Sequence, residues 1–386
     1  MLRPCPICLS EGKKKFFRQN FGNKAIAIMD GYDVVVCQKC GFVFADNIPG
    51  QEEFNKYYEI MSKWEFNYKD GVVSEDYQKY FKKIIDFLVP HLKDKRAKIV
   101  DIGCSTGCLL NMLKEKGYVN LLGIDPSPTC VKTVKELYGI DAVADTISNF
   151  SAENKFDVII LSAVLEHLVD FSGSVDKIQS LLNEGGLLFV EVPDATRFDS
   201  YIFTPFQQFS IEHIDYFSDV SLKNLLGKFG FEIVEMQKNE NTVNQTIDPD
   251  IFVLAKFSPQ LKSEIVKDDI TEKKLGDYIS KCAQLDIEVN KFLSEVLGKH
   301  EKIIIWGVGT HTQRLVGAGL DLAKVLYFVD SNVKYHGKKI NGVEIKSPRE
   351  IKENAPILIS TFSYQEEVAR QIKDELKLKN EIVKIY

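Results

Sequence analysis

The sequence has 386 residues, of which 45% are hydrophobic and 27% are charged, an ordinary composition for globular domains. The length predicts two or three domains. A net charge of -6 argues against a nucleic-acid-binding surface, and the longest apolar run, around Val158–Leu165, is too short to span a membrane. Because the first residues hold a motif rather than the apolar core of a signal peptide, we expect a cytoplasmic protein with reduced thiols.

Two Cys-x-x-Cys pairs stand near the N-terminus, Cys5 with Cys8 and Cys37 with Cys40. Each pair puts two thiolates on one tight turn, and two such turns can surround one metal ion with a tetrahedron of sulfur atoms. Iron or disulfides would use the same residues, but a reduced compartment favours structural zinc. Because all four positions are cysteine, no coordination position is left open for catalysis.

The segment between the two pairs predicts strands at Ala25–Ile28 and Tyr32–Val36, which complete a zinc ribbon over residues 1–50. The basic run Lys13–Lys15 is interpreted as a solvated loop. So small a unit buries too little core to fold alone, so the metal would supply the missing stability. Four other cysteines lack paired spacing and are expected to be buried small apolar side chains: Cys104, Cys108, Cys130 and Cys282.

Residues 51–97 are expected to link the ribbon to the main domain. We expect the aromatic-rich segment Glu52–Asp70 either to pack between the ribbon and the main domain or to form a lid over a bound cofactor or acceptor. In the second case Tyr58, Ser62 and Lys63 would be the polar tips of the lid. Apolar residues from Tyr77 to Leu88 follow helical spacing and predict a helix that packs one face on a sheet.

Strands and helices alternate regularly after Lys98, which predicts a parallel sheet with right-handed crossovers. The fold class is therefore α/β and Rossmann-like, with a domain over residues 98–258. Ligands bind at the carboxyl ends of the strands in such a sheet. The expected strands are Ile99–Ile102, Leu121–Ile124, Ala142–Ala144, Val158–Leu161 and Leu187–Val192, and the expected helices are Gly107–Lys116, Thr129–Tyr138 and Val175–Leu182.

Acidic residues and glycines mark the predicted carboxyl edge. Asp101 ends the first strand, and Gly103 and Gly107 let the backbone approach a ligand closely. Asp125 ends the second strand, where it can accept both ribose hydroxyls, and Asp145 follows the third within reach of an adenine amino group. A dinucleotide would use similar residues, but the loop lacks the G-x-G-x-x-G spacing that seats a pyrophosphate.

Five motifs in order, DIGCSTG, LLGIDPS, the acid of AVADT, FDVIILSAVLEHL and LNEGGLLFVEVPD, resemble those of class I S-adenosylmethionine-dependent methyltransferases. The resemblance covers Lys98–Pro193 and implies S-adenosylmethionine as cofactor. It implies methionine-side contacts near Asp101 and the glycine loop, where Ser105 replaces the family's usual glycine. The residues implied to bind the cofactor are Asp101, Gly103, Cys104, Gly107, Asp125, Pro126, Asp145 and Thr146.

Methyl transfer needs a positioned acceptor and a base that removes its proton. The candidates are His167, which follows Glu166 just after a predicted strand, and His213, which follows Glu212 in a predicted loop before a helix capped by Ser218. Each histidine could instead make a structural hydrogen bond, and this alternative is stronger for His167. The polar and aromatic connection Asp194–Gln208 fits an acceptor-binding loop.

A wider resemblance covers essentially the whole chain. The ribbon, the methyltransferase core, the EHxxYFS segment and a C-terminal Rossmann-like domain occur together in the sugar C-methyltransferases of deoxysugar biosynthesis, which act on nucleotide-linked keto sugars. The resemblance implies that His213 is the base and Glu212 its partner. Ser210 stands where that family commonly has tyrosine, and the segment YYEIMSKW also differs. Because both departures are on the acceptor side, a different sugar, a hydroxyl or another acceptor stays open.

The last third predicts a strand pair, Phe231–Met236 and Asp250–Phe257, around a loop at Asn239–Pro249, and then an amphipathic connector helix within residues 259–300. Residues 301–386 predict a second, smaller Rossmann-like domain that binds the acceptor's nucleotide. NAD binding and a purely structural role are alternatives, because the third glycine of the dinucleotide motif is replaced by Thr312. The residues expected to border the nucleotide are Gly307, Gly309, Thr310, His311 and Asp330.

The sequence thus predicts a methyltransferase that uses S-adenosylmethionine and structural zinc and acts on a small, nucleotide-linked sugar. The predicted catalytic residues are His213, Glu212 and His167. An O-methyltransferase and a non-catalytic nucleotide-binding protein are the alternatives. We expect no nucleic-acid or membrane partner, and a monomer or a homodimer.

Overall fold

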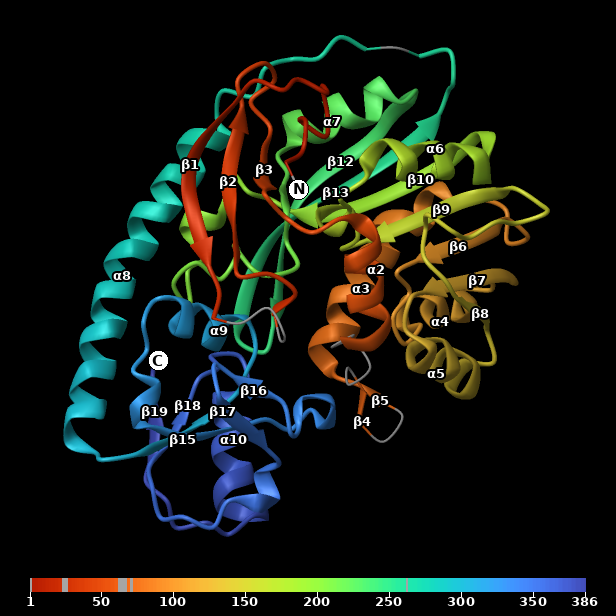
Figure 1. Ribbon diagram of the computed structural model, residues 1–386. Coiled ribbons are helices and arrows are strands. Elements are labelled where there is room, and N and C mark those ends of the chain that lie inside the picture. Colours follow the sequence, from red (N-terminus) through yellow and green to blue (C-terminus); the bar gives the residue numbers. More distant parts are fainter. Residues whose placement is uncertain (1, 23–26, 62–67, 70–71, 262) are drawn as a thin grey trace.

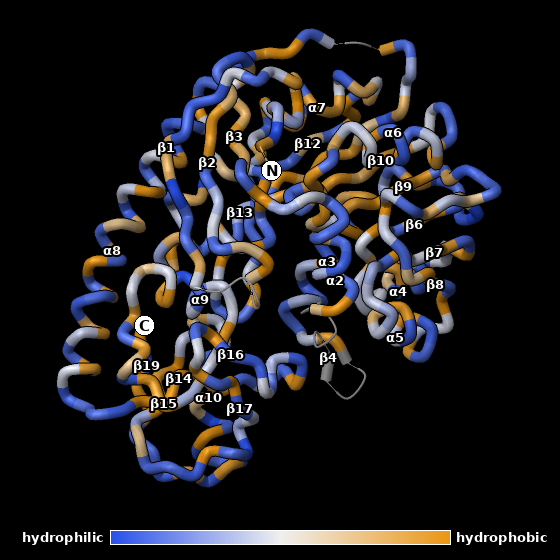
Figure 2. The backbone as a smooth tube through the Cα atoms, in the orientation of Figure 1, coloured by the Kyte–Doolittle hydropathy of each residue, from blue (hydrophilic) through white to orange (hydrophobic). Residues whose placement is uncertain are grey.

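The computed structural model describes residues 2–22, 27–61, 68–69, 72–261 and 263–386. Figure 1 shows a large sheet with its helices, a small N-terminal sheet beside it and a separate C-terminal unit, and the long helix α8 runs along one side from the upper part to the lower. In Figure 2 hydrophobic stretches follow the strands, whereas polar and apolar bands alternate along α8. Within the described ranges, none of the helices is long and apolar enough to cross a membrane.

The large sheet has seven strands in the order β12-β13-β10-β9-β6-β7-β8. The predicted alternation is confirmed, because β10, β9, β6, β7 and β8 run parallel. The strand order reverses at β6, since β7 lies on one side of it and β9 on the other, and ligands bind at such a switch point. The elements are β6 (Lys98–Ile102), α4 (Cys108–Glu115), β7 (Asn120–Asp125), α5 (Pro128–Tyr138), β8 (Asp141–Ala144), β9 (Phe156–Ser162), η3 (Leu165–His167), α6 (Phe171–Leu181) and β10 (Leu182–Pro193).

The predicted loop at Asn239–Pro249 is wrong. Strands β12 (Phe231–Val243) and β13 (Thr246–Phe257) continue through it and pair as far as Val243 with Thr246. The two-residue turn between them has positive φ at Asn244 and Gln245, as in the hairpin turns that match strand twist. The polar residues are consistent with strands here because most of β12 lies at the surface. Helix α7 (Asp219–Lys228) begins at the predicted cap, Ser218.

The N-terminal sheet consists of β1 (Lys13–Asn20), β2 (Gly31–Cys37), β3 (Val43–Asp46) and β11 (Asp215–Tyr216), in that order. The predicted loop at Lys13–Lys15 is wrong, because these lysines begin β1. Their charges are accommodated across the strands, where Lys13 and Lys15 each lie 2.7 Å from an aspartate, Asp46 and Asp33 respectively.

The strand predicted at Ala25–Ile28 is also not observed. Its first two residues lie outside the described residues, and Ala27 and Ile28 are not in a strand. The second predicted strand, Tyr32–Val36, is confirmed as part of β2. Because β11 comes from the distant residues Asp215 and Tyr216, the sheet is completed by the segment that carries His213. A buried ion pair of 3.3 Å between Arg3 and Asp215 joins the N-terminal segment to the segment that carries His213.

The linker contains α2 (Gln51–Met61), a short hairpin of β4 (Tyr68–Lys69) and β5 (Val72–Val73), α3 (Glu75–Leu88) and η2 (Val89–His91). The predicted packing of α3 is confirmed. Ile84, Ile85 and Leu88 are buried in one cluster with Phe189 and Phe252 of the large sheet. Ser62 and Lys63, predicted as tips of a lid, lie outside the described residues.

The C-terminal unit is a second α/β arrangement with the strand order β16-β17-β15-β14-β18-β19. Its strands are parallel except for β16. The predicted connector helix is α8, which packs Tyr278 and Cys282 in the N-terminal cluster and Val289 and Leu293 in the C-terminal core. The elements are α8 (Thr271–Lys299), β14 (Ile303–Trp306), α9 (Thr310–Gly317), η5 (Leu322–Lys324), β15 (Val325–Val329), η6 (Val333–Tyr335), β16 (Lys339–Ile340), β17 (Val343–Lys346), η7 (Pro348–Glu350), β18 (Ile357–Ile359), α10 (Gln365–Arg370), a π-helical turn (Gln371–Glu375) and β19 (Ile382–Lys384).

Candidate functional site

Four cysteine sulfurs converge at one end of the N-terminal sheet. Cys5 Sγ lies 3.5 Å from Cys40 Sγ, and Cys8 Sγ lies 3.4 Å from Cys37 Sγ. All four sulfurs lie within 4.8 Å of one another. These separations exceed a disulfide bond and are close to the roughly 3.8 Å between sulfurs that share a tetrahedral zinc ion. The donor set therefore fits one tetrahedral metal ion. The four cysteines predicted to lie outside the cluster are all buried, and none of them is in a disulfide.

The glycine loop after β6 is shaped by three residues with positive φ, Gly103, Ser105 and Gly107. Gly103 has φ 81° and donates its N–H to the Ile124 carbonyl at 2.7 Å. A Cβ added to Gly103 would lie 2.6 Å from a methyl carbon of Val164, and one added to Gly107 would lie 2.9 Å from a methyl carbon of Val134. Both positions therefore require glycine, for conformation as well as for space.

Asp125 braces this loop. Its Oδ2 accepts the Ser105 N–H at 2.9 Å, and its Oδ1 accepts the Ser127 N–H at 2.8 Å. Each carboxylate oxygen has a second lone pair, so the same residue could accept ribose hydroxyls. Pro126 precedes Ser127, the N-cap of α5. Asp125, which is predicted to bind the ribose, thus also fixes the shape of the glycine loop.

Two hydroxyl oxygens at this edge, Ser105 Oγ and Thr146 Oγ1, are buried and have no hydrogen-bond partner among the described residues. The backbone N–H of Thr146 is held by Asp145 Oδ1 at 2.7 Å. The Cys104 sulfur is buried against Gly123, where an added Cβ would lie 2.6 Å from it, and its contact with the cofactor stays a prediction. Buried hydroxyls without partners indicate a ligand, so these residues fit an adenosyl cofactor.

The two candidate histidines lie together although they come from different loops. Their ring centroids are 5.1 Å apart. The Ile214 N–H donates to the Glu166 carbonyl at 2.9 Å and so fastens one loop to the other. Donor atoms of Glu166, His167 and His213 all lie within 4.8 Å of one another. The three side chains therefore converge on one point.

Two tyrosines of α2 contact this group. His167 Nδ1 lies 2.9 Å from the Glu212 carbonyl and 3.2 Å from the Tyr58 hydroxyl. The Tyr57 hydroxyl donates to Glu212 Oε1 at 3.2 Å. A proton on Nδ1 directed at the Glu212 carbonyl leaves Nε2 of His167 as the acceptor. Tyr57 was not among the polar tips predicted for this segment, which was expected to pack against the main domain or to form a lid over the site.

Ser210 has a local role. Its Oγ accepts the N–H groups of Glu212 at 3.3 Å and His213 at 3.0 Å, and its carbonyl accepts the Tyr32 hydroxyl at 2.9 Å. The serine that stands in place of the family's tyrosine thus shapes the turn that presents Glu212 and His213.

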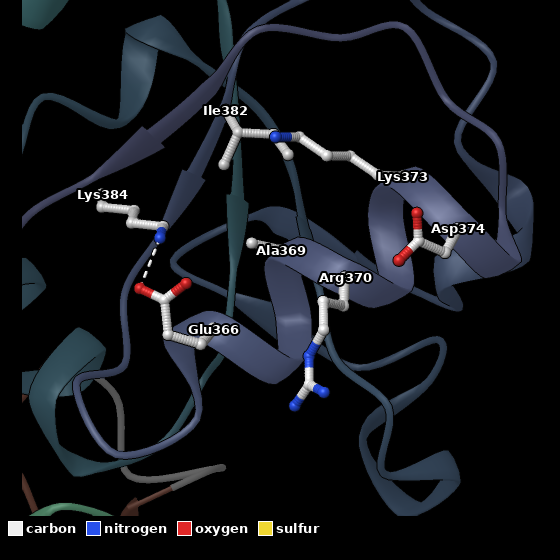
Figure 3. A pocket seen from close by; sticks show the side chains of 7 residues that line it. All are labelled: Glu366, Ala369, Arg370, Lys373, Asp374, Ile382 and Lys384. Atoms are coloured by element: carbon white, nitrogen blue, oxygen red, sulfur yellow. Dashed lines mark hydrogen bonds and ion pairs between the residues drawn. The ribbon is translucent and has the colours of Figure 1, made fainter.

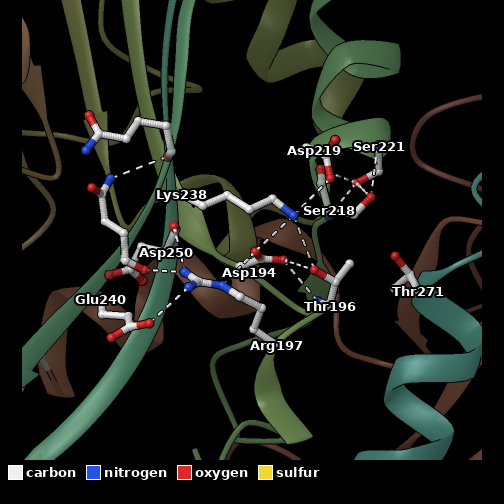
Figure 4. A network of polar contacts seen from close by, with 12 residues as sticks. Asp194, Thr196, Arg197, Ser218, Asp219, Ser221, Lys238, Glu240, Asp250 and Thr271 are labelled. Carbon is white, nitrogen blue, oxygen red and sulfur yellow. Dashed lines mark hydrogen bonds and ion pairs between the residues drawn. The ribbon is translucent and has the colours of Figure 1, made fainter. Parts of the chain in front are cut away.

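The connection Asp194–Gln208 is fastened at its start by a network of charges (Figure 4). Buried Asp194 lies 3.1 Å from Arg197 Nε and 3.3 Å from Lys238 Nζ. Lys238 also lies 3.1 Å from Asp219 at the beginning of α7. The first residues of the predicted acceptor-binding loop are therefore anchored to the large sheet and to α7.

In the C-terminal unit, Asp330 holds the loop after β14 in the same way that Asp125 holds the loop after β6. Asp330 Oδ2 accepts the Val308 N–H at 3.0 Å and Oδ1 accepts the Asn332 N–H at 2.8 Å, while the Gly307 N–H donates to the Val329 carbonyl at 2.8 Å. The place predicted for His311 beside a nucleotide stays a prediction. His311 lies between Ser360 Oγ and the Tyr386 hydroxyl, and burial lowers its pKa to about 3, so it is neutral.

The same end of the C-terminal unit faces the methyltransferase residues. Lys338 Nζ lies 3.9 Å from the sulfur of Met61 in α2, and Phe362 stacks on Phe203 with centroids 5.4 Å apart. Burial raises the pKa of Tyr335 above its ordinary value, and the nearby charges of Asp330 and Glu212 raise it further. Tyr335, which sequence reasoning missed, therefore belongs to the surroundings of Glu212.

Two surface cavities lie elsewhere. One, of about 390 Å³, is lined by α10, the π-helical turn and β19 (Figure 3). The other, of about 400 Å³, lies between α3 and the outer strands β12 and β13. Neither cavity is lined by a residue predicted to bind the cofactor or to take part in catalysis, so the candidate site is not assigned to either of them.

Comparisons with known proteins agree with this geometry. Residues 73–236 match the sequence profile of a family described as "Methyltransferase domain", and residues 299–383 match one described as "C2185-like, N-terminal". The tRNA U34 carboxymethyltransferase of Aliarcobacter butzleri is 28% identical over 195 residues, which are 48% of this chain and 59% of that protein. The ubiquinone biosynthesis O-methyltransferase of Xylella fastidiosa is 29% identical over 121 residues, which are 29% of this chain and 48% of that protein.

This chain thus spans 59% of the length of the first relative and 48% of the second. Magnesium protoporphyrin IX methyltransferase from Synechocystis, solved with bound S-adenosylmethionine, is 17% identical, with 55% of this chain and 98% of that chain covered at a TM-score of 0.40. The family match, together with the ordered motifs of the sheet, identifies residues 73–236 as a class I S-adenosylmethionine-dependent methyltransferase domain.

Proposed function

We propose that the protein methylates a small acceptor, a nucleotide-linked sugar, at a carbon next to a keto group, with His213 as the base. The observation that carries this proposal is the convergence of Glu166, His167 and His213 on one point beside the cofactor domain. The cofactor supplies a methyl group that is already activated on a sulfonium sulfur. The chain's own residues then have to orient the acceptor, take its proton and keep water out.

Each residue of the group has a distinct task in this proposal. His213 removes the proton from the acceptor carbon, and Ser210 holds its backbone in the turn. The Tyr58 hydroxyl, beside His167 Nδ1, and the His167 ring would orient the acceptor's oxygen. Glu212 is held by Tyr57 and supports the loop through its carbonyl, which accepts from His167. Hydrogen-bond donors that are in position before the reaction would stabilise the negative charge that develops on the acceptor oxygen.

The C-terminal unit would bind the nucleotide part of the acceptor. Its glycine loop and Asp330 repeat the bracing seen around Asp125, in keeping with a second Rossmann-like site. Among the described residues, chain neighbours aside, none has an atom within 4 Å of a Cβ built on Gly309, so there is room beside this position. Tyr335 and Lys338 lie between this loop and α2. An acceptor bound across both units would reach His213 with its sugar end.

The four cysteines would hold zinc with a structural role. Their separations suit tetrahedral coordination, and all positions would be occupied by thiolates. The zinc would stabilise the sheet that β11 completes, and β11 begins two residues after His213.

An O-methyltransferase is the second candidate. Ser210 removes the tyrosine that the sugar C-methyltransferases commonly carry, and one curated relative is named as an O-methyltransferase. A tRNA acceptor, suggested by the name of the other relative, is disfavoured by the net charge of -6. Nuclear magnetic resonance of the isolated product separates the first two candidates, because a methyl group on carbon and one on oxygen differ in chemical shift.

The deciding experiment replaces His213 with alanine in the full chain. Nucleotide sugars are first screened by thermal shift in the presence of S-adenosylhomocysteine, and the best ligand is used as acceptor. We expect His213→Ala to lower turnover by about a hundredfold or more while S-adenosylmethionine binding is kept. His91→Ala, which removes a surface histidine paired with Glu235, is the matched control. Unchanged turnover in His213→Ala would overturn the assignment of the base.

A further inference from the structure

Arg3 is a buried arginine two residues before the first cysteine pair, and only 3% of its surface is exposed. Its Nη1 donates to the Ala45 carbonyl of β3 at 3.2 Å, and its Cζ lies 5.6 Å from the centroid of the Phe44 ring. A guanidinium group is a rigid planar fork with five N–H donors. It can therefore hold several acceptors in one fixed arrangement.

The other terminal nitrogen of Arg3 contacts both segments that carry the candidate histidines. Nη2 lies 3.3 Å from Asp215 Oδ2, two residues after His213. It also donates to the Val169 carbonyl at 3.1 Å, two residues after His167, and at 3.4 Å to the carbonyl before it. One guanidinium group thus reaches both loops within two residues of each histidine.

Asp215 depends on this contact. Its side chain is fully buried, and Arg3 is the one cation that pairs with it among the described residues. Its second oxygen, Oδ1, accepts no hydrogen bond in the same part of the chain. Burial raises the pKa of Asp215 to about 7, and the guanidinium opposes this shift. Because a buried carboxylate is costly without a partner, Arg3 determines where the Asp215 side chain lies.

The backbone of Arg3 is held by β1 and β3. Its N–H donates to Asp46 Oδ1 at 2.8 Å, and its carbonyl accepts from Lys13 Nζ at 2.6 Å. Lys13 and Asp46 also pair with each other at 2.7 Å. The guanidinium is therefore a fixed point to which the two histidine loops are attached.

His167 is held on both sides along the chain. Before it, the Glu166 carbonyl accepts the Ile214 N–H at 2.9 Å, which joins the two loops through their backbones. After it, the Val169 carbonyl accepts from Arg3. Fixing the chain on both sides limits the positions that the His167 ring can take. Without Arg3 the loops would be joined on one side of this histidine, through Ile214.

We propose that Arg3 is a positioning residue for methyl transfer, which sets the separation of His167 and His213 by holding the backbone after one and the side chain of Asp215 after the other. The inference rests on the proposed function, in which both histidines face the acceptor. Arg3 contacts none of the residues predicted to bind the cofactor, as far as the described residues go. Its removal should therefore affect the acceptor side of the reaction alone.

The test has to separate positioning from stability. Arg3→Met alone leaves Asp215 buried without a cation, which destabilises the fold. The double variant Arg3→Met with Asp215→Leu removes both charges, and replacing a buried ion pair by apolar side chains is often neutral for stability. We expect the double variant to unfold close to the temperature of the unmodified chain. A purely structural role of Arg3 predicts that its activity is then normal as well.

A matched control is available in the same small sheet. Arg18 and Asp33 also form an ion pair of 3.3 Å, but on β1 and β2 and partly exposed. Arg18→Met with Asp33→Leu changes the same residue types at a pair that contacts neither histidine loop. This control should alter neither of the two measurements below.

The first measurement needs no acceptor. Nuclear magnetic resonance of the full chain with labelled histidine records the ring signals, which His167→Ala and His213→Ala assign. Because the ring centroids are 5.1 Å apart, a nuclear Overhauser effect should connect the two rings in the unmodified chain. It should be lost in the Arg3 and Asp215 double variant and kept in the control.

The second measurement is turnover with the acceptor found by the thermal-shift screen. In the double variant kcat should fall about a hundredfold, as for a displacement of about 1 Å in an active site. The affinity for S-adenosylmethionine should change by less than about twofold, because the cofactor residues are distant from the change. If the double variant does not fold, Arg3→Lys takes its place, since an ammonium group keeps the charge but lacks the planar fork that reaches both loops.

An Overhauser effect that persists in the folded double variant, or that is absent from the unmodified chain, would overturn the proposal. Failure of the proposed function gives a different result. In that case the ring contact is lost in the double variant while turnover stays normal, and His213→Ala also keeps its turnover.

Discussion

His167 and His213 meet edge to face, with ring centroids 5.1 Å apart and ring planes at 61°. One histidine follows β9 and the other precedes β11, so the contact exists only because the N-terminal sheet is built partly from the methyltransferase domain. The Ile214 N–H bond to the Glu166 carbonyl keeps the two loops in register. This arrangement makes several outcomes measurable.

Replacing Tyr58 with phenylalanine removes the hydroxyl beside His167 Nδ1. We expect turnover to fall about tenfold, because His167 loses a fixed contact in the acceptor space, while S-adenosylmethionine affinity stays the same. Steady-state kinetics and calorimetry measure the two quantities. Tyr201→Phe, at the surface next to Glu240, serves as the control. A loss of cofactor affinity equal to the loss of turnover would contradict a role on the acceptor side.

Replacing Cys40 with serine removes one of the four metal donors. Elemental analysis should find about one zinc ion per chain in the unmodified protein and much less in Cys40→Ser. The free energy of unfolding should fall by more than about 4 kcal/mol, since this small sheet depends on the metal. Cys108→Ala, which changes a cysteine outside the cluster, should keep the zinc. Full zinc content in Cys40→Ser would rule out tetrahedral coordination by these four residues.

Replacing Tyr335 with alanine alters the C-terminal unit where it faces Glu212. If the acceptor binds across both units, KM for the nucleotide-linked acceptor should rise about tenfold with little change in cofactor affinity. Val333→Ala, at an exposed position of the same turn, is the control. An unchanged KM would remove the C-terminal unit from acceptor binding and leave it a structural role.

The raised pKa of Asp101, about 8, also predicts how stability depends on pH. The folded chain holds this proton more tightly than the unfolded chain, so the contribution of Asp101 is fully present below pH 4 and is lost as pH rises through 8. Asp101→Asn should therefore raise the free energy of unfolding at pH 8.5 by about 1 kcal/mol or more, with little effect at pH 4. Thermal unfolding at the two pH values tests this. Equal effects at both values would indicate that Asp101 is ionised throughout.

The sequence by itself determined the features that depend on local pattern. Apolar runs followed by Asp101 and Asp125 predicted the parallel sheet and its cofactor edge, because a strand and the turn after it are encoded by neighbouring residues. The paired spacing of Cys5 with Cys8 and of Cys37 with Cys40 predicted a metal cluster for the same reason. The helix predicted from the apolar spacing between Tyr77 and Leu88 is also observed, as α3 (Glu75–Leu88).

Only the tertiary structure decided the remainder. The polar stretch of β12 and β13 looked like a loop because its pairing partner and its two-residue turn become visible only when the strands meet. Tyr57 and Tyr335 carry no local signal that would place them in a site. The fold brings both of them close to Glu212, which lies far from them in the sequence. Hydrogen bonds and charge interactions act over a few ångströms in space, and the sequence lists their partners without giving those distances.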